Sequence, residues 1–150
     1  MSRWLLIAAA IMVPVAPALT LAQGQVKGKP QAAQVKLWAA ISVQNPVFPK
    51  IRANDLAITF AIVNDGRTPV NPGIGSSRLF INGVELHDWH MIVTNGPCTS
   101  FCEALPPGRT LLFSKGLGNY FQKPGVYAVR WEGQNFRTLD LTLRVLPGDL

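Results

Sequence analysis

The segment 124–133 reads Pro124-Gly125-Val126-Tyr127-Ala128-Val129-Arg130-Trp131-Glu132-Gly133. A proline–glycine pair precedes a run in which β-branched and aromatic residues dominate, and a second glycine follows the run. The run is too short for a stable helix and is rich in residues that favour extended backbone. The segment therefore predicts a central β-strand bounded by two turns, and the other predicted strands pack around it.

Tyr127 is the most informative residue of this strand. It stands two residues after Gly125, and the large apolar Phe121 precedes it by six residues. This arrangement resembles the tyrosine corner of Greek-key sandwiches, in which the tyrosine hydroxyl bonds back to the backbone of the same corner. The resemblance implies that Pro124, Gly125 and Tyr127 form a structural corner.

Alternating apolar residues predict further strands on both sides of the corner. The clearest alternation covers 55–63, where large side chains face the core and small ones face away. A first strand over 35–43, placed at a sheet edge, has one face made of Val35, Leu37, Ala39, Ile41 and Val43. A last strand over 139–146 is expected to turn inward the residues Leu139, Leu141, Leu143 and Val145.

Shorter apolar runs complete the pattern. Asn82-Gly83 lies between two of them and predicts a type I′ hairpin, because both turn positions need a positive φ. Residues 110–113 predict another strand, and 91–93 briefly resume the strand pattern. Among the tryptophans, Trp89 and Trp131 are expected to pack in the core, and Trp38 is expected to be exposed.

The number of strands defines the fold class. About seven or eight short strands without a sustained helical period predict an all-β sandwich. Their order over 35–146 resembles an immunoglobulin-like (Ig-like) or fibronectin-III-like domain, which implies a Greek-key β-sandwich. The resemblance carries no site, because both cysteines fall in one loop instead of bridging two sheets.

The first residues predict export. One positive residue, a short apolar run and small residues at a cut site are typical of a signal peptide, here 1–22. Cleavage is expected after Ala22, with the site ending at Ala18 as the alternative. The run contains two prolines and is shorter than the ~20 residues of a membrane-spanning helix. We expect a flexible leader over 23–34, a domain over 35–147, and a secreted or periplasmic protein without membrane insertion.

Composition limits the partners. Charged residues make up 15% of the chain, and the net charge is +6. The positive residues are scattered singly, with no interleaved aromatic residues, so nucleic-acid binding is not expected. The 13 glycines and 12 prolines favour short strands joined by many turns. We expect a monomer without a cofactor.

The two cysteines identify a candidate binding loop. An even count in an exported protein favours a disulfide between Cys98 and Cys102. A bridge across three residues would stiffen the proline-rich loop 95–106. The residues expected to contact a partner are Asn95, Pro97, Thr99, Phe101 and Glu103.

Metal binding and catalysis are the chemical alternatives. His87, His90 and Met91 precede the cysteine pair, and imidazole, thioether and thiolate ligands suit copper. An extended 87–90 segment would place the two imidazoles on opposite faces, and a disulfide would remove the thiolates. Four serines could act as nucleophiles, but none lies in a nucleophile elbow, namely Ser76, Ser77, Ser100 and Ser114. We therefore expect no catalytic or metal site and keep copper binding as an alternative.

Two narrower resemblances concern function. Segments 60–64 and 124–127 are similar to the strand–Asn–turn and Pro-Gly-x-Tyr elements of the proteinase-inhibitor family named for a bacterial intracellular inhibitor. That resemblance implies an inhibitory role for the loop 95–106. Segment 71–86 looks like secreted proteins of planctomycete-type bacteria that have no assigned function, which implies export and no activity.

These observations lead to one expected function. The sequence predicts a secreted, non-catalytic Ig-like binding or structural module of the bacterial cell envelope, with a protein or envelope component as its partner. The alternatives are a proteinase-inhibitor domain that presents the 95–106 loop and a copper-binding periplasmic protein.

Overall fold

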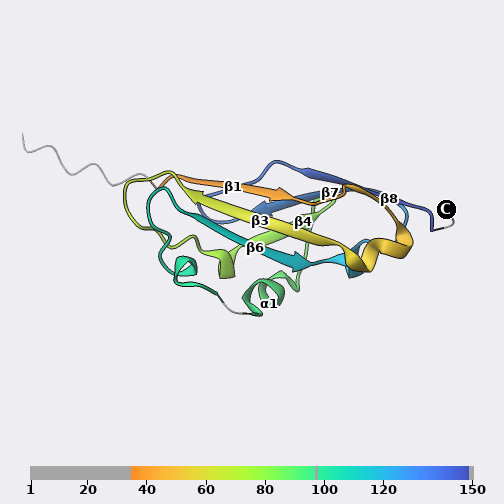
Figure 1. The fold of residues 1–150 in the computed structure, drawn as a ribbon, viewed down its shortest axis with the longest axis horizontal. Coiled ribbons are helices and arrows are strands. Elements are labelled where there is room, and N and C mark those ends of the chain that lie inside the picture. The colour runs from red at the N-terminus through yellow and green to blue at the C-terminus, as the bar shows by residue number, and fades with distance from the viewer. Residues whose placement is uncertain (1–34, 97, 149–150) are drawn as a thin grey trace, which may run out of the picture. The chain divides into compact units, whose positions relative to one another are not determined.

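The structure, a computed structural model, describes residues 35–96 and 98–148 and folds them into two packed β-sheets (Figure 1). In the first sheet, the order is β1 (Leu37–Ser42), β3 (Ala57–Asn64) and β6 (Thr110–Gly116). In the second sheet, it is β2 (Val47–Pro49), β8 (Leu141–Leu146), β7 (Gly125–Glu132), β4 (Arg78–Ile81) and β5 (Val84–Glu85). The expected Ig-like Greek-key sandwich is confirmed, with eight strands in the described residues.

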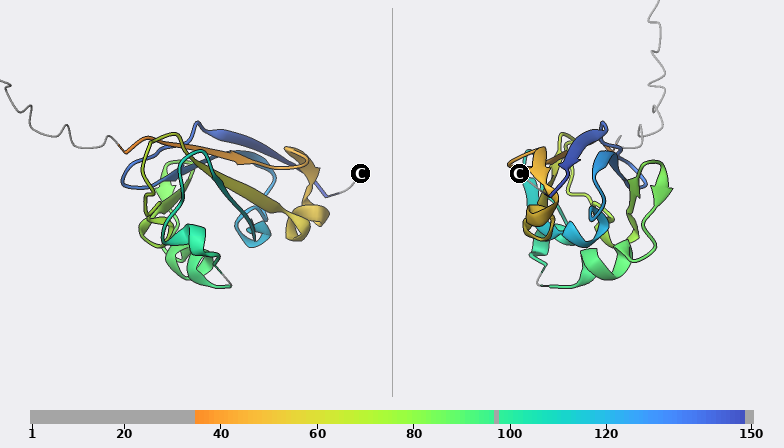
Figure 2. Two further views of the ribbon diagram at one scale, coloured as in Figure 1. Left: turned by 60° about the vertical axis from the view of Figure 1, so that its left-hand side comes forward. Right: turned by 90° about the vertical axis from the view of Figure 1, so that its right-hand side faces the viewer.

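Short helices connect the strands. The α-helix α1 (Trp89–Thr94) follows β5, and Figures 1 and 2 show it on the side of the sandwich where β4 and β6 lie. The 3₁₀ helices are η1 (Lys50–Asp55), η2 (Ile74–Ser76), η3 (Ser100–Cys102) and η4 (Gly118–Tyr120). The predicted signal peptide 1–22, the predicted leader 23–34 and Pro97 lie outside the described residues.

Strand β7 occupies the middle of the five-stranded sheet, as the sequence predicts. It pairs antiparallel with β8 on one side and with β4 on the other. Its inward residues Val129 and Trp131 are fully buried. In the other sheet β1 lies at an edge, also as expected, and pairs only with β3 among the described strands.

The core is built on the alternation along β3. Ile58, Phe60 and Ile62 are fully buried, while the small residues between them face outward. The Phe60 ring lies 5.0 Å from the Trp89 ring and 5.1 Å from the Trp131 ring, measured between centroids. Because Trp89 belongs to α1 and Trp131 to β7, Phe60 joins the helix and the second sheet to the first sheet.

One buried hydroxyl holds the two indoles. The Ser77 Oγ atom accepts hydrogen bonds from Trp89 Nε1 at 3.0 Å and from Trp131 Nε1 at 2.9 Å. The same hydroxyl donates to the carbonyl of Ile74. Buried N–H groups need acceptors, and Ser77 supplies one atom for both rings.

The structure contains the hydrogen bond that defines a tyrosine corner. The Tyr127 hydroxyl donates to the Lys123 carbonyl at 2.7 Å, four residues upstream. The Tyr127 ring also packs on the Phe121 ring in a T-shaped arrangement, with centroids 5.1 Å apart. Hairpin formation at Asn82-Gly83 is confirmed, because both residues have positive φ angles, 51° and 78°.

Two local predictions are wrong, and one strand is not predicted. Residues 91–93, expected to be extended, belong to α1, and so His90 is helical and the extended geometry assumed for 87–90 does not apply. The buried residues of α1, Trp89 and Val93, are four positions apart, which is one face of a helix. Three consecutive apolar residues are compatible with both the strand period of 2 and the helix period of 3.6. Packing of Trp89 and Val93 against the core favours the helix.

The other two differences concern the strands β8 and β2. Leu139 is 91% exposed instead of inward, because β8 begins only at Leu141. Thr138 exchanges hydrogen bonds with the backbone of Trp131 just before this point, which fixes the turn that precedes β8. The predicted first strand over 35–43 is followed by a strand that the sequence pattern does not predict, because Val47–Pro49 form β2 and pair parallel with β8.

Replacing Ser77 tests the role of the shared acceptor. Ser77→Ala leaves two buried indole N–H groups without their acceptor, so we expect a loss of about 2–4 kcal/mol in the free energy of unfolding. Ser76→Ala is the matched control, because the Ser76 hydroxyl bonds to a backbone carbonyl at the exposed surface. Denaturant midpoints measure both variants. Equal losses of stability in the two variants would contradict the role of Ser77 as the shared acceptor of the two indole N–H groups.

Tyr127→Phe tests the corner. The substitution keeps the ring against Phe121 and removes only the bond to Lys123, so we expect a loss of about 0.5–1.5 kcal/mol. Tyr120→Phe is the control, since the Tyr120 hydroxyl lies 3.5 Å from the Asp88 carboxylate, too far for a strong hydrogen bond. Thermal and denaturant unfolding measure both variants. An unchanged midpoint for Tyr127→Phe would show that the hydrogen bond from Tyr127 to Lys123 does not stabilise the fold.

Candidate functional site

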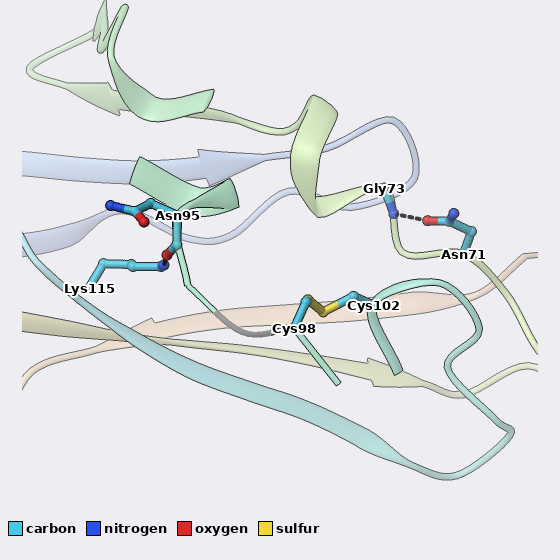
Figure 3. Close-up of a disulfide and its surroundings, with 6 residues drawn as sticks. All are labelled: Asn71, Gly73, Asn95, Cys98, Cys102 and Lys115. Atoms are coloured by element: carbon cyan, nitrogen blue, oxygen red, sulfur yellow. Dashed lines mark hydrogen bonds between the residues drawn. A yellow bond between two sulfur atoms is a disulfide. The ribbon is translucent and has the colours of Figure 1, made fainter. Parts of the chain in front are cut away.

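The candidate binding loop is closed by a disulfide. Cys98 and Cys102 are bonded as the sequence predicts, with Cα atoms 6.0 Å apart (Figure 3). The 3₁₀ helix η3 brings them together, because the Cys102 N–H donates to the Thr99 carbonyl at 2.9 Å. We call residues 98–105 the stapled loop.

The chain is fixed to the sandwich on both sides of the staple. Before it, the Lys115 Nζ atom of β6 donates to the Asn95 carbonyl at 2.6 Å (Figure 3). After it, Leu105 and Val70 exchange two backbone hydrogen bonds of 2.8 and 3.1 Å. The buried Asn64 side chain donates to the Leu105 carbonyl at 2.8 Å. The loop is therefore held by backbone groups, which leaves its side chains available.

The predicted contact residues fall into two groups. Asn95, Thr99 and Glu103 are exposed, as are Cys98 and Ser100. Phe101 is half-buried, packs on the core and lies 5.6 Å beneath the Arg109 guanidinium, so it supports the loop. Pro97 lies outside the described residues. The exposed surface of the stapled loop is thus polar, with an aromatic residue beneath it.

A cavity of about 400 Å³ opens beside the staple. Its floor is apolar, since Ile74 and Val93 are 8% and 7% exposed. Asn71 lies at the wall, where its Oδ1 atom accepts from the Gly73 N–H at 2.7 Å (Figure 3). The other lining residues are Gly73, Gly75, Ser76, Thr94, Cys98 and Cys102. The sequence did not reveal this cavity, because the loop 71–76 before β4 is far along the chain from the helix and the staple.

A second cavity of about 70 Å³ lies between the staple and β6. It shares Ile74, Val93 and both cysteines with the larger cavity, and its far wall is the segment 111–113 with Lys115. The disulfide therefore forms a wall common to both cavities. Any movement of the staple would change the shape of both.

The possible copper ligands do not form a site. Both sulfur atoms are used in the disulfide, Met91 is 64% exposed on α1, and His87 is exposed before the helix. The His90 Nδ1 atom lies 2.7 Å from the Gly75 carbonyl, which assigns the N–H to that nitrogen. Within 35–96 and 98–148, no three His, Cys, Asp or Glu residues are grouped so that they could hold a metal ion.

Three of the four serines considered as nucleophiles have structural hydrogen-bond partners. Ser77 is the buried acceptor of the two indoles, and Ser76 bonds to the Gly73 carbonyl. The Ser114 hydroxyl shares a hydrogen bond with Thr59 on the neighbouring strand. Ser100 is exposed at the start of η3. None of the hydrogen bonds found for these four serines joins them to a histidine.

Among the residues that the structure describes, two titratable groups have shifted pKa values, and both lie outside the loop. Burial and the nearby Asp88 carboxylate raise the pKa of Tyr120. Hydrogen bonds from Lys36 and Trp38 lower the pKa of Asp65 from its usual 3.8. Because the folded pKa is the lower one, any stabilisation by this contact is present above about pH 4 and is lost as the pH falls through the folded value.

The described residues include no helix long and apolar enough to cross a membrane. No family model and no curated protein matches the chain. A crystal structure of a CARDB domain from Pyrococcus furiosus in complex with di-metal ions is 16% identical, with a TM-score of 0.43 over 74% of this chain and 93% of that one. A solution NMR structure of the same domain is 17% identical, with a TM-score of 0.42 over 73% of this chain and 94% of that one. None of these findings supports the resemblance to proteinase inhibitors or to planctomycete-type exported proteins.

Removing the staple should loosen the loop and leave the fold intact. The double variant Cys98→Ser/Cys102→Ser opens a small ring, so we expect a stability loss below the ~3 kcal/mol of a 15-residue ring. Amide hydrogen exchange should become faster in the stapled loop and stay slow in β3 and β7. Reductant should reproduce the effect in the wild type and change nothing in the variant. Global unfolding of the variant would show that the staple is part of the folding core.

Proposed function

We propose that this protein is an exported, non-catalytic Ig-like binding module that presents the stapled loop to a protein partner of the cell envelope. The observation that supports it is the combination of anchored backbone and exposed side chains in 98–105. Lys115 holds one side, the Val70–Leu105 pairing holds the other, and the disulfide closes the middle. Such a loop loses little conformational entropy on binding, so more of its contact energy contributes to affinity.

The surface next to the loop indicates the chemistry of the partner. Thr99, Ser100 and Glu103 offer polar contacts, and the cavity of about 400 Å³ has an apolar floor. An apolar side chain that enters this cavity, surrounded by polar contacts, matches the usual organisation of a protein interface. We therefore infer a protein segment with one protruding aliphatic or aromatic residue as the binding partner.

Export is a part of this proposal that rests on the sequence. The signal-like segment 1–22 predicts passage across a membrane, and disulfides persist in oxidising compartments. The Cys98–Cys102 bond is consistent with that route. We place the mature protein in the periplasm or outside the cell.

The inhibitor and copper alternatives have less support. A loop that occupies a proteinase cleft as a substrate does must be extended, whereas Ser100–Cys102 form a 3₁₀ helix. Copper binding by the cysteines requires thiolates, which the disulfide removes. Free thiols in the exported protein would restore the copper hypothesis.

Affinity capture with matched variants tests the proposed function. The protein is immobilised and exposed to an envelope extract of the producing cell, and retained proteins are quantified by mass spectrometry. Thr99→Arg places a large charged side chain on the stapled loop, and Gln134→Arg places the same charge on an exposed turn elsewhere. We expect a partner that the wild type and Gln134→Arg retain and that Thr99→Arg retains at least tenfold less. Equal retention of every protein by the two variants would reject the loop as the binding surface.

A further inference from the structure

In residues 35–96 and 98–148 the two sheets have four edge strands, and three of them are protected against pairing with another strand. Strand β2 has three residues and ends in Pro49, and β5 has two residues, one of them Glu85. Strand β6 is flanked by the chain around the staple, which lies across a small cavity from it and is tied to Lys115. Short length, proline, charge and a covering loop are the usual means of blocking an edge.

Strand β1 has none of these protections. Leu37–Ser42 contains six residues, with no charge, proline or glycine among them. Within the described residues it pairs only with β3, in continuous register from Leu37 opposite Asn64 to Ser42 opposite Thr59. Its other side therefore presents a row of backbone N–H and C=O groups that can pair with another strand.

The strands β1, β3 and β6 place no charged side chain on the outer face of their sheet. Cross-strand rows place Trp38 beside Val63 and Thr110, and Ala40 beside Ala61 and Leu112. Trp38 is 61% exposed and Leu112 is 65% exposed. The remaining outward positions of the three strands are Ser42, Ala57, Thr59, Ser114 and Gly116. If the β1 strand of a second copy paired with β1 and extended this sheet, no two charged side chains from these strands would face each other.

Trp38 is held in place at the corner of this face. Its Nε1 atom donates to the Asp65 carboxylate at 3.2 Å, and the Lys36 ammonium forms an ion pair with Asp65 at 2.6 Å. The Lys36 Nζ atom also lies 5.8 Å from the centre of the Trp38 ring. A tryptophan with a fixed orientation loses little entropy when it is covered, which is typical of residues that dominate interfaces.

Three arginines of the second sheet lie on the face of the sandwich opposite to this one. Arg78, Arg130 and Arg144 alternate with the buried Leu79, Trp131 and Val145, so they lie on the outer face of the second sheet. Packed sheets are about 10 Å apart, which is close to the ≈ 8 Å screening length at physiological salt. These three arginines therefore add little repulsion between two copies that meet at β1.

We propose that two copies of this chain associate by antiparallel pairing of β1 with β1, centred on Ala40. A two-fold axis at Ala40 brings the same strand from both copies together and joins two three-stranded sheets into one of six strands. It also places Trp38 of each copy opposite Ser42 of the other, so the large residue meets a small one. The dimer replaces the monomer expected from the sequence.

Charge substitutions at the centre test this pairing. Ala40 is exposed, so Ala40→Lys and Ala40→Asp each leave the core untouched, but each puts two like charges directly opposite at the axis. Like charges opposite each other destabilise a strand pair, so we expect the dissociation constant of each variant to rise about fivefold or more. Val126→Lys is the control, because Val126 is 58% exposed on the other sheet. Sedimentation velocity across a concentration series measures all four proteins.

Mixing the two Ala40 variants tests whether residue 40 of one copy lies opposite residue 40 of the other. Lys from one copy then faces Asp from the other, so the mixture should form a heterodimer more tightly than either variant forms a homodimer. Raising the salt concentration should not weaken the wild-type dimer, because the contact is uncharged. The proposal is overturned by a wild type that stays monomeric at the highest concentration reached, by dissociation of Val126→Lys, or by a mixture that does not associate.

Discussion

The Ser77 hydroxyl is the interaction on which the rest of the structure depends. It is the acceptor for two buried indoles that come from different elements, Trp89 of α1 and Trp131 of β7. Phe60 of the opposite sheet packs on both rings, so the sheets and the helix share one aromatic cluster. Because unpaired indole N–H groups are costly in a core, this one atom fixes how both rings point. The position of α1 then determines where the chain leaves the helix at Asn95, and therefore where the stapled loop begins.

The two edges of the first sheet are used differently. Beside β6, the chain around the staple flanks the edge and is tied to Lys115, which hinders the approach of another strand. At β1, the chain crosses to the second sheet after Ser42 and forms β2 beside β8, which leaves the outer edge of β1 uncovered by any described strand. The sandwich thus has the stapled loop at one edge and, in our proposal, a pairing strand at the other. Alternation along each strand sends successive side chains to opposite faces of its sheet. The outer face of the first sheet therefore collects the uncharged residues of β1, β3 and β6, and the outer face of the second sheet collects Arg78, Arg130 and Arg144.

Local chemistry made much of the fold predictable. The alternation along β3, the positive φ angles at Asn82-Gly83 and the tyrosine corner each depend on a few neighbouring residues. The disulfide was predictable for the same reason, since three residues separate its cysteines. Other features depend on residues far apart in the sequence. Trp89 and Val93 become a helical face only when Phe60 and Ser77 are in place, and the cavity beside the staple needs three separate segments. The binding role of the loop and the export of the chain remain predictions.

The proposed dimer would be geometrically compatible with binding through the stapled loop. In a sheet ordered β6, β3, β1, β1, β3, β6, five strand spacings place the two β6 strands roughly 24 Å apart. The stapled loops lie beyond β6 at the outer edges, so pairing at β1 does not cover them. A dimer would therefore offer two equivalent loops to a partner that is repeated on a cell surface. The second contact then becomes intramolecular, and the apparent affinity rises without any change in the loop itself. A soluble partner with a single site gains nothing from this arrangement. Pairing through β1 would consequently favour partners that are fixed in the envelope over the same partners free in solution.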